Sequence, residues 1–332
     1  MCGIVGAVAE RNVAPILIQG LQRLEYRGYD SAGLAVLQAD GTLQRRREVG
    51  KVVNLSSNLD AAPVQGTMGI AHTRWATHGT VQEANTHPHM SGNDLALVHN
   101  GIIENYTTLR EELQSMGYVF SSETDSEVIV HLIHSCLGEN GLLQAVRQAV
   151  KRLEGAYAIA VCLAADAGRI VAARSGCPLV VGKGIGENFL ASDVLALKAV
   201  TDRFIFLEEG DLVELRADSI DIWSIDNESV LRADVRIEMG KDDLDKGNFR
   251  HYMQKEIFAQ PQVLEATMQG RIGKESVLEQ SFGIGAREIF DRTEAITIVA
   301  CGTSFYAASV ARYWIEDLVG IPCQVEIASE FR

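Results

Sequence analysis

The chain has 332 residues, a formal net charge of -14 and a hydrophobic fraction of 47%. This composition is typical of a globular protein with more than one core, and the acidic balance disfavours nucleic acid and anionic membrane surfaces as partners. No apolar stretch reaches the length of about 18 residues that a membrane-spanning helix needs, and no basic segment precedes an apolar signal core. We therefore expect a cytoplasmic protein that acts on a small molecule.

The first 225 residues or so contain many short apolar or alternating runs and a few segments of helical periodicity. Strands are expected at residues 3–9, 33–39, 68–73, 95–101, 156–164, 203–211, 212–217 and 219–225. Helices are expected at residues 13–25, 105–117, 126–137 and 142–154. Such grouping favours an α+β sandwich over a regular βαβ series.

The composition then changes, because residues 234 to 250 are charged and turn-rich, as in a connector. Beyond it, residues 251–269 predict a helix that breaks at Pro261, and residues 295–328 predict strand, tight turn, helix and strand, one βαβ unit of a parallel sheet. One such unit does not close a doubly wound sheet, so we expect this second domain to be incomplete. The expected division is a domain at 2–233, a linker with a connecting helix at 234–285, and a partial domain at 286–332.

Cys2 stands directly behind Met1 and before the apolar run GIVGAVA. Removal of Met1 would place a thiol and a free α-amino group on one residue, which supplies a nucleophile and a base together. An α-amine with a pKa of about 7.8 is roughly one-third unprotonated at about pH 7.5, whereas a lysine side chain is almost fully protonated at that pH. The alternative is a small residue at a frayed terminus, but the apolar run predicts a buried first strand that holds Cys2 in place.

Three segments supply groups that thiolate attack on an amide would need. Asn100 and Gly101 end a strand and offer a side-chain amide and a backbone N–H for an oxyanion; the alternative is an ordinary turn. Arg74 can hold a carboxylate bidentately. Asp125 can bind an α-ammonium group, although its segment SETDSE also reads as a helix cap in which Thr124 or Asp125 takes part. Arg74 and Asp125 together would select a zwitterionic amino acid.

Residues 72–79, HTRWATHG, place several further site-type residues in what we expect to be one short loop, with a solvated loop as the alternative. In the second domain, Gly302, Thr303 and Ser304 lie at a strand-to-helix turn that suits a phosphate; the alternative is an ordinary capped turn.

No metal site is expected, because His87 and His89 lack a carboxylate or cysteine cluster, and no cofactor is expected. The six cysteines contain no CxxC pair, and four are expected to be buried structural thiols: Cys136, Cys162, Cys177 and Cys323.

Taken in order, these motifs closely resemble the glucosamine-6-phosphate synthase family of glutamine amidotransferases. The matching stretches are MCGIVGAV, LQRLEYRGYDSAG, GIAHTRWATHG, NTHPH, VHNGIIENY, SETDSE, FLEEGD, FRHYMQKEI, CGTSFYA and IPCQVEIASEFR. The resemblance implies a four-layer αββα N-terminal-nucleophile glutaminase domain, followed by the start of a sugar-isomerase (SIS) domain that binds fructose 6-phosphate. The chain ends at SEFR, so we expect it to carry the glutaminase half-reaction and to lack the isomerase half.

The resemblance also implies roles for individual positions. Cys2 would be the nucleophile, and Asn100 and Gly101 the oxyanion hole. Trp75 would be the gate of an ammonia channel, and the sugar phosphate would meet Gly302, Thr303 and Ser304. The glutamine-binding positions would be Arg27, Arg74, Thr77, His78, Gly101 and Asp125, with Gly28 beside Arg27 on the floor of the site.

Two alternatives remain from the sequence. The first is another amidotransferase of the same glutaminase type, which the strand-CGTS-helix unit disfavours. The second is a sugar-phosphate-binding regulatory module with an inert Cys2. The family resemblance implies that the full-length protein is a homo-oligomer, and we expect a dimer.

Overall fold

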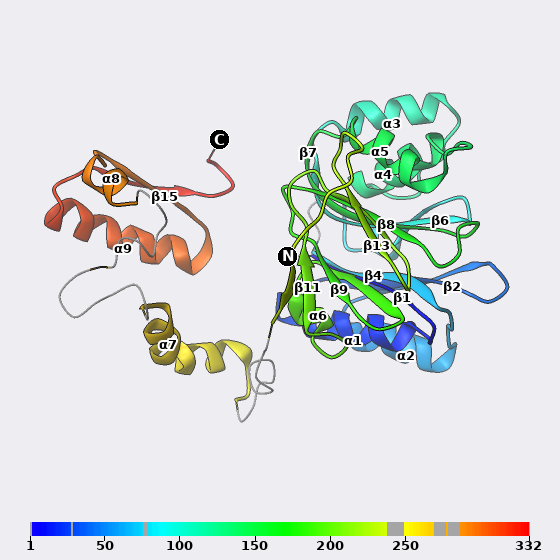
Figure 1. Cartoon of the computed structure of the whole chain (residues 1–332), viewed down its shortest axis with the longest axis horizontal. Helices are drawn as coiled ribbons and strands as arrows, with labels where there is room; N and C mark the ends of the chain where they lie inside the picture. Colours follow the sequence, from blue (N-terminus) through cyan, green and yellow to red (C-terminus); the bar gives the residue numbers. More distant parts are fainter. Residues whose placement is uncertain are drawn as a thin grey trace. The chain divides into compact units, whose positions relative to one another are not determined.

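The computed structural model describes residues 2–331 except 28, 76–78, 238–248, 269–276 and 278–285. The chain divides into two compact units, Met1–Asp245 and Lys246–Arg332 (Figure 1). None of the helices in the described part of the chain is long and apolar enough to cross a membrane.

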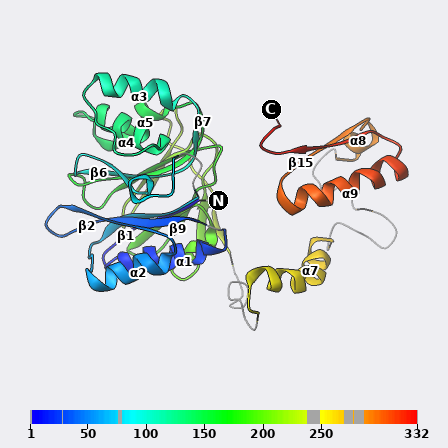
Figure 2. The same ribbon diagram turned by 180° about the vertical axis from the view of Figure 1, so that it is seen from behind.

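The first unit contains two antiparallel sheets that face each other, as Figures 1 and 2 show from opposite sides. The eight-stranded sheet has the order β14-β11-β9-β10-β1-β4-β2-β3, and the six-stranded sheet has the order β13-β12-β8-β7-β6-β5. The strands of the first are β14 Asp234–Arg236, β11 Arg203–Phe206, β9 Val180–Lys183, β10 Glu187–Ala191, β1 Gly3–Ala9, β4 Met68–Arg74, β2 Ser31–Leu37 and β3 Leu43–Val49. Those of the second are β13 Ile220–Trp223, β12 Leu212–Leu215, β8 Ile170–Ser175, β7 Gly155–Leu163, β6 Leu95–Ile103 and β5 His89–Ser91.

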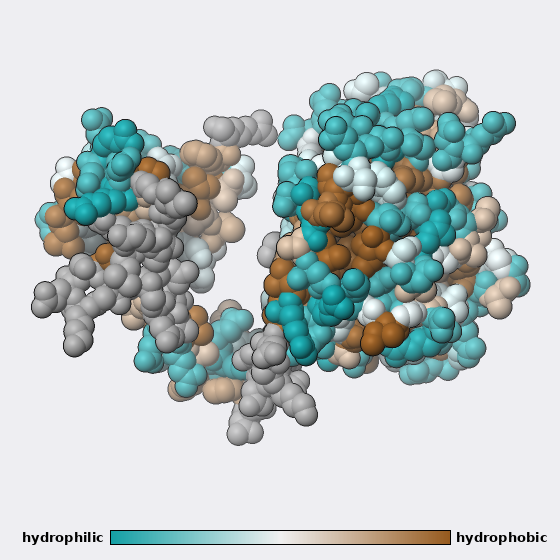
Figure 3. All heavy atoms as spheres, in the orientation of Figure 1, coloured by the Kyte–Doolittle hydropathy of each residue, from teal (hydrophilic) through white to brown (hydrophobic). Residues whose placement is uncertain are grey.

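A layer of helices covers the outer face of each sheet (Figure 1). The larger sheet is covered by α1 Ala14–Leu24, α2 Val52–Ala61 and α6 Val194–Leu197, and the smaller by α3 Tyr106–Ser115, α4 Asp125–Ser135 and α5 Gly141–Val150. The outer surface around α3 is mostly hydrophilic (Figure 3), as expected for the solvent side of an amphipathic layer. The four layers confirm the expected αββα sandwich.

Side-chain alternation along the strands separates the cores of this sandwich. On β1, Ile4 and Val8 belong to the core between the two sheets, whereas Val5 and Ala7 belong to the core between the larger sheet and the helices that cover it. Both faces of β1 are therefore buried, which explains its continuous apolar run. The same alternation directs the even-numbered side chains of β1, β4 and β6 between the sheets, at whose end the candidate site lies.

Two expected boundaries were wrong near that end. Strand β4 continues to Arg74, one residue beyond the expected strand 68–73, because Arg74 pairs with Ser31 of β2; residues 72–74 are therefore strand and not part of the loop expected at 72–79. Strand β6 continues to Ile103, and the Asn100-Gly101 pair lies inside it and not at a turn. In both cases, pairing with a neighbouring strand extends the strand beyond the apolar run.

Two expectations in the connector also need correction. Residues 234–236 pair with β11 as strand β14, so the sheet continues past the expected boundary at residue 233. Helix α7, Tyr252–Met268, contains Pro261 in its interior and does not break there. A proline removes one hydrogen bond of the helix and crowds the carbonyl four residues earlier, but the turns on either side of Pro261 remain helical.

The second unit also contains helix α8, Ala286–Asp291, and the expected strand-helix-strand unit. Strand β15, Ile296–Ala300, pairs in parallel with β16, Cys323–Ile327, through the crossover helix α9, Gly302–Leu318. This confirms a small parallel sheet at the C-terminal end of the chain. Of the four thiols expected to be buried, Cys162 and Cys323 are buried, but Cys136 and Cys177 are partly exposed.

Candidate active site

Cys2 lies at the start of β1, one step beyond the pairing of Gly3 with Thr73, and therefore beside the end of β4. The backbone N–H of Trp75 donates to the Cys2 sulfur over 3.2 Å. The sulfur is also 3.5 Å from the Trp75 carbonyl oxygen, to which the protonated thiol can donate. Sheet pairing on one side and these contacts on the other hold the thiol in one position.

A small pocket joins this thiol to residues from three other segments. Its lining includes Cys2, Arg74 with Trp75 from the end of β4, Gly101 from β6, and Asp125 from the start of α4. His87, His99, Thr124 and Ser126 complete the lining. A thiol, a guanidinium, a glycine backbone and a carboxylate therefore line one small space.

The Arg74 guanidinium is almost entirely buried, with a side-chain exposure of 4%. Its Nη1 atom lies 3.7 Å from the Asp30 carboxylate and donates to the Thr80 carbonyl oxygen over 3.3 Å. The Asp30 backbone N–H in turn donates to the Arg74 carbonyl oxygen over 2.8 Å. A planar guanidinium fixed in this way is suited to bidentate recognition of a carboxylate.

Asn100 and Gly101 occupy the part of β6 that approaches Cys2. The Asn100 Nδ2 atom donates to the Cys2 carbonyl oxygen over 3.4 Å, and the Asn100 Oδ1 atom lies 2.9 Å from His72 Nε2. Gly101 has a φ of 132°, and a Cβ at this position would overlap the Ala156 carbonyl oxygen. Only glycine fits this backbone, which leaves no side chain between its N–H and the pocket.

The position of Asp125 depends on how helix α4 begins. Thr124 is the N-cap, and its Oγ1 atom accepts from the Glu127 backbone N–H over 3.3 Å, so the expected cap is confirmed. The Asp125 Oδ2 atom accepts from the Ile103 backbone N–H over 2.9 Å, which ties the start of α4 to the end of β6. The carboxylate therefore has a fixed distance from Gly101.

Replacing Thr124 by valine keeps the side-chain shape but removes the cap oxygen. We expect a loss of about 1–2 kcal/mol in the free energy of unfolding, because one N-terminal N–H of α4 loses its partner. We also expect a higher KM for the amino-acid substrate that the sequence predicts, because the cap positions Asp125, the first residue of the helix. Urea unfolding and steady-state kinetics measure the two effects.

Thr108→Val is the matched control, since Thr108 is exposed within helix α3. It should change neither quantity appreciably. An unchanged unfolding free energy in Thr124→Val would contradict the assigned cap.

Burial determines the charge of the groups in this region. Burial raises the pKa of the Cys2 thiol, an effect that the Trp75 hydrogen bond partly offsets. Burial lowers the pKa of His72 to about 3, and it holds the pKa values of His87 and His89 well below their ordinary value. At neutral pH these three histidines are uncharged and the thiol is protonated, so attack by Cys2 needs a base other than these three rings.

The structure brings together Cys2, Arg74, Asn100, Gly101 and Asp125. Trp75 lies at the rim of the pocket with 52% of its surface exposed. Thr77, His78 and Gly28 lie outside the described residues, and only the backbone of Arg27 is described, as the last residue of the 3-10 turn Glu25–Arg27. Gly302, Thr303 and Ser304 lie in the other unit, where they form the exposed first turn of α9 and not a turn that precedes the helix.

Some pocket residues were not assigned a role from the sequence. His99 and Ser126 are neighbours of Asn100 and Asp125, and they contact each other across 2.9 Å from His99 Nδ1 to Ser126 Oγ. Strand alternation in LALVHNG places His99 on the helix-facing side of β6, so the sequence could have indicated that His99 meets the start of a helix. No local pattern indicates that Asp30 meets Arg74, because this pair depends on the register of β2 against β4.

Comparison with known proteins agrees with this geometry. A family described as a glutamine amidotransferase domain matches residues 72–199. The chain is 60% identical over its whole length to a protein of Pseudomonas putida named glutamine–fructose-6-phosphate aminotransferase [isomerizing], and 56% identical to a protein of Vibrio vulnificus with the same name. It covers 54% of each, so the chain spans about half the length of the curated relatives it matches.

Solved structures show the same fold. The structure of an allosteric regulatory enzyme of purine biosynthesis matches 68% of this chain and 49% of its own, with a TM-score of 0.59 and 28% identity. A glutamine phosphoribosylpyrophosphate amidotransferase from B. subtilis matches 98% of this chain and 65% of its own, with a TM-score of 0.59. Its identity of 21% supports the fold alone.

Proposed function

We propose that this chain belongs to the glutamine–fructose-6-phosphate aminotransferase family and hydrolyses glutamine to glutamate and ammonia. One observation carries the proposal: the pocket that contains the Cys2 thiol is also lined by Arg74, Gly101 and Asp125. These groups meet the requirements for binding a free amino acid and attacking its side-chain amide.

Arg74 and Asp125 are the proposed contacts for the two charged ends of glutamine. The Arg74 guanidinium would bind the α-carboxylate, and the Asp125 carboxylate would bind the α-ammonium group. Both side chains are buried and form hydrogen bonds with the backbone, which favours a binding geometry that is fixed before the substrate arrives. The side-chain amide of the substrate would then extend towards the sulfur. Arg27, Thr77 and His78 are proposed as further glutamine-binding positions.

Cys2 is the proposed nucleophile, after removal of Met1. Its α-amine, with an ordinary pKa of about 7.7–8.0, takes the thiol proton as the sulfur attacks the amide carbon. The carbonyl electrons move onto oxygen, where Asn100 Nδ2 and the Gly101 N–H stabilise the negative charge. The amine returns the proton to the leaving nitrogen, ammonia departs, and water hydrolyses the thioester to glutamate and the free thiol.

For the whole protein we propose the activity named for its relatives, which is transfer of glutamine nitrogen to fructose 6-phosphate. The parallel strand-helix-strand unit would belong to the sugar-isomerase part, with Gly302, Thr303 and Ser304 near the sugar phosphate. Trp75, exposed at the rim, would gate the path of ammonia. A cytoplasmic dimer acting in amino-sugar synthesis is the corresponding proposal for location and assembly.

A direct assay tests the glutaminase proposal. The purified chain, assayed with and without fructose 6-phosphate, should release glutamate and ammonia in equal amounts from glutamine. Arg74→Lys retains the charge but not the planar fork, so it should raise the KM for glutamine by about 10-fold or more.

The control for Arg74→Lys is Arg203→Lys, an exposed arginine paired with Asp234 in the same sheet. It should leave the KM unchanged. A chain that binds fructose 6-phosphate but never hydrolyses glutamine, even after Met1 is removed, would instead favour the regulatory-module alternative.

A further inference from the structure

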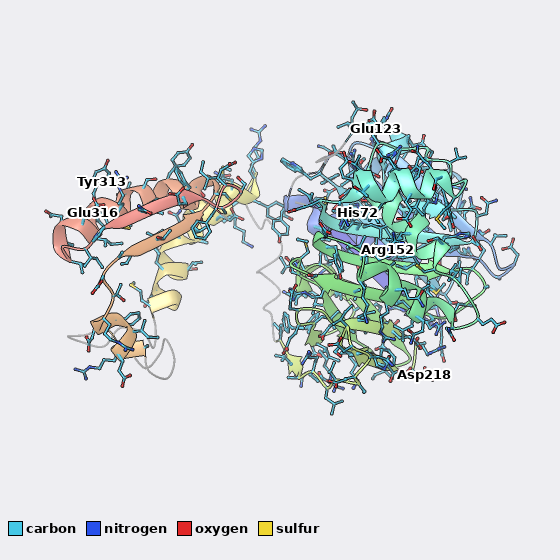
Figure 4. The ribbon with its side chains drawn as sticks, turned by 90° about the horizontal axis from the view of Figure 1, so that it is seen from above. His72, Glu123, Arg152, Asp218, Tyr313 and Glu316 are labelled. Carbon is cyan, nitrogen blue, oxygen red and sulfur yellow. The ribbon has the colours of Figure 1, made fainter. Side chains whose placement is uncertain are left out.

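His72 lies where the two sheets meet beside the nucleophile. It pairs with Ile4 of β1, and strand alternation turns its side chain between the sheets in the same way as those of Met68 and Ile70. Figure 4 marks it among the strands of the first unit, while Glu123 lies at the periphery. Its exposure is 1%, so its polar atoms depend on protein partners.

One hydrogen bond links this ring to Asn100. The His72 Nε2 atom lies 2.9 Å from Asn100 Oδ1, and the Asn100 Nδ2 atom donates to the Cys2 carbonyl oxygen over 3.4 Å. A carboxamide oxygen only accepts, so the proton must be on Nε2 of His72. His72 thus donates to one end of the amide, while Cys2 accepts from the other end.

The orientation of that amide decides whether Asn100 helps or hinders the reaction. The two ends of a carboxamide have nearly the same shape, so rotation by 180° about its last torsion costs little in packing. The rotated amide would place its oxygen, not its N–H groups, beside Cys2, where the oxyanion develops. Its NH2 group would then face the His72 N–H, donor against donor. Moving the proton to Nδ1 would bury an N–H at an atom that has no hydrogen-bond partner, so His72 disfavours the rotated state.

Neighbouring rings hold the His72 imidazole in the position from which it donates to Asn100. Its imidazole stacks on that of His87 with centroids 4.1 Å apart and planes at 21°. His87 is itself fixed, because its Nδ1 atom accepts from the His99 backbone N–H over 3.3 Å. Burial lowers the pKa of His72 to about 3, so the ring is neutral at neutral pH and carries a single N–H.

We propose that His72 is a positioning residue, which fixes the carboxamide of Asn100 so that its NH2 group faces the reacting carbonyl oxygen beside Cys2. This inference rests on the proposed glutaminase function. His72 touches neither the substrate nor the reacting atoms, and it acts only through Asn100. Its loss should therefore lower kcat and leave the KM for glutamine nearly unchanged, since Arg74 and Asp125 remain in place.

Three substitutions test the donor. His72→Leu removes the N–H and should lower kcat by about 10- to 100-fold, somewhat less than the loss of an oxyanion donor itself. His72→Gln places an amide N–H near the position of Nε2 and should recover most of kcat. His72→Asn is shorter, places its amide nearer the position of Nδ1, and should remain as slow as His72→Leu.

A double-mutant cycle tests whether the effect passes through Asn100. In an Asn100→Ala background, His72→Leu should cause no further fall in kcat, because no amide is left to orient. A fall of the same size in both backgrounds would overturn the proposal, as would equal recovery by the Gln and Asn variants. If His72→Leu fails to fold, the comparison of the Gln and Asn variants still decides the matter.

His131→Gln is the matched control, because His131 is also buried and bonded, through Nδ1 to Ser91 Oγ over 2.9 Å. It does not line the pocket, so it should lower the melting temperature without changing kcat. If the unsubstituted chain hydrolyses glutamine and His72→Leu does so at the same kcat, only the role of His72 is wrong. If the unsubstituted chain is inactive, the proposed function itself fails.

Discussion

Replacement of Cys2 by alanine is expected to lower the rate of glutamine hydrolysis by about 10⁴-fold or more, to the background of the assay. In the proposed mechanism the sulfur forms the covalent bond to the substrate, and no other thiol lines the pocket among the described residues. The pocket and the fold should survive, because the alanine side chain fits wherever the cysteine side chain does. Glutamate release and thermal unfolding measure the two expectations.

Cys136→Ala is the matched control for this variant. Cys136 is also partly exposed, but it lies directly after helix α4 and does not line the pocket. Its glutaminase rate should equal that of the unsubstituted chain. Glutamine hydrolysis that persists in pure Cys2→Ala would show that a different group is the nucleophile.

Replacement of Asn100 by aspartate should lower kcat by about 10³-fold, with little change in the KM for glutamine. The substitution preserves the shape of the side chain and its acceptor for the His72 N–H. It removes both amide N–H donors, however, and places a carboxylate where negative charge develops on the substrate. Steady-state kinetics at saturating glutamine measure the effect.

Asn227→Asp is the control, because it adds the same charge at an exposed turn position. It should leave kcat unchanged. An Asn100→Asp variant with nearly full kcat would contradict the assignment of Asn100 to the oxyanion hole, whatever the result for Cys2.

The strongly patterned elements of the fold were predictable from the sequence. The continuous apolar run of β1 and the helical spacing of α1 each follow from which faces the element buries. Strand β3 was missed because its sequence, LQRRREV, carries three arginines at the edge of the sheet. Helix α2 was missed because its polar sequence buries only Val52 and Leu55.

The candidate site was predictable where the chemical role depends on a single residue type at a particular position. The position of Cys2, the fork of Arg74 and the amide of Asn100 each suggested a role from local sequence. The contacts that orient these residues were not predictable, because they join residues that are distant in sequence, such as His72 to Asn100 and Arg74 to Asp30. These pairs depend on strand register, which local periodicity does not determine.

Intact-mass analysis of the chain after reaction with a diazo-ketone analogue of glutamine shows whether Cys2 is the nucleophile. We expect a chain that lacks Met1 and carries one adduct, located on Cys2 by peptide mapping. Excess glutamine should slow the labelling, because both ligands would occupy the pocket beside Arg74 and Asp125. A chain that retains Met1 and remains unlabelled, or that carries its adduct on another residue, would show that Cys2 is not the nucleophile.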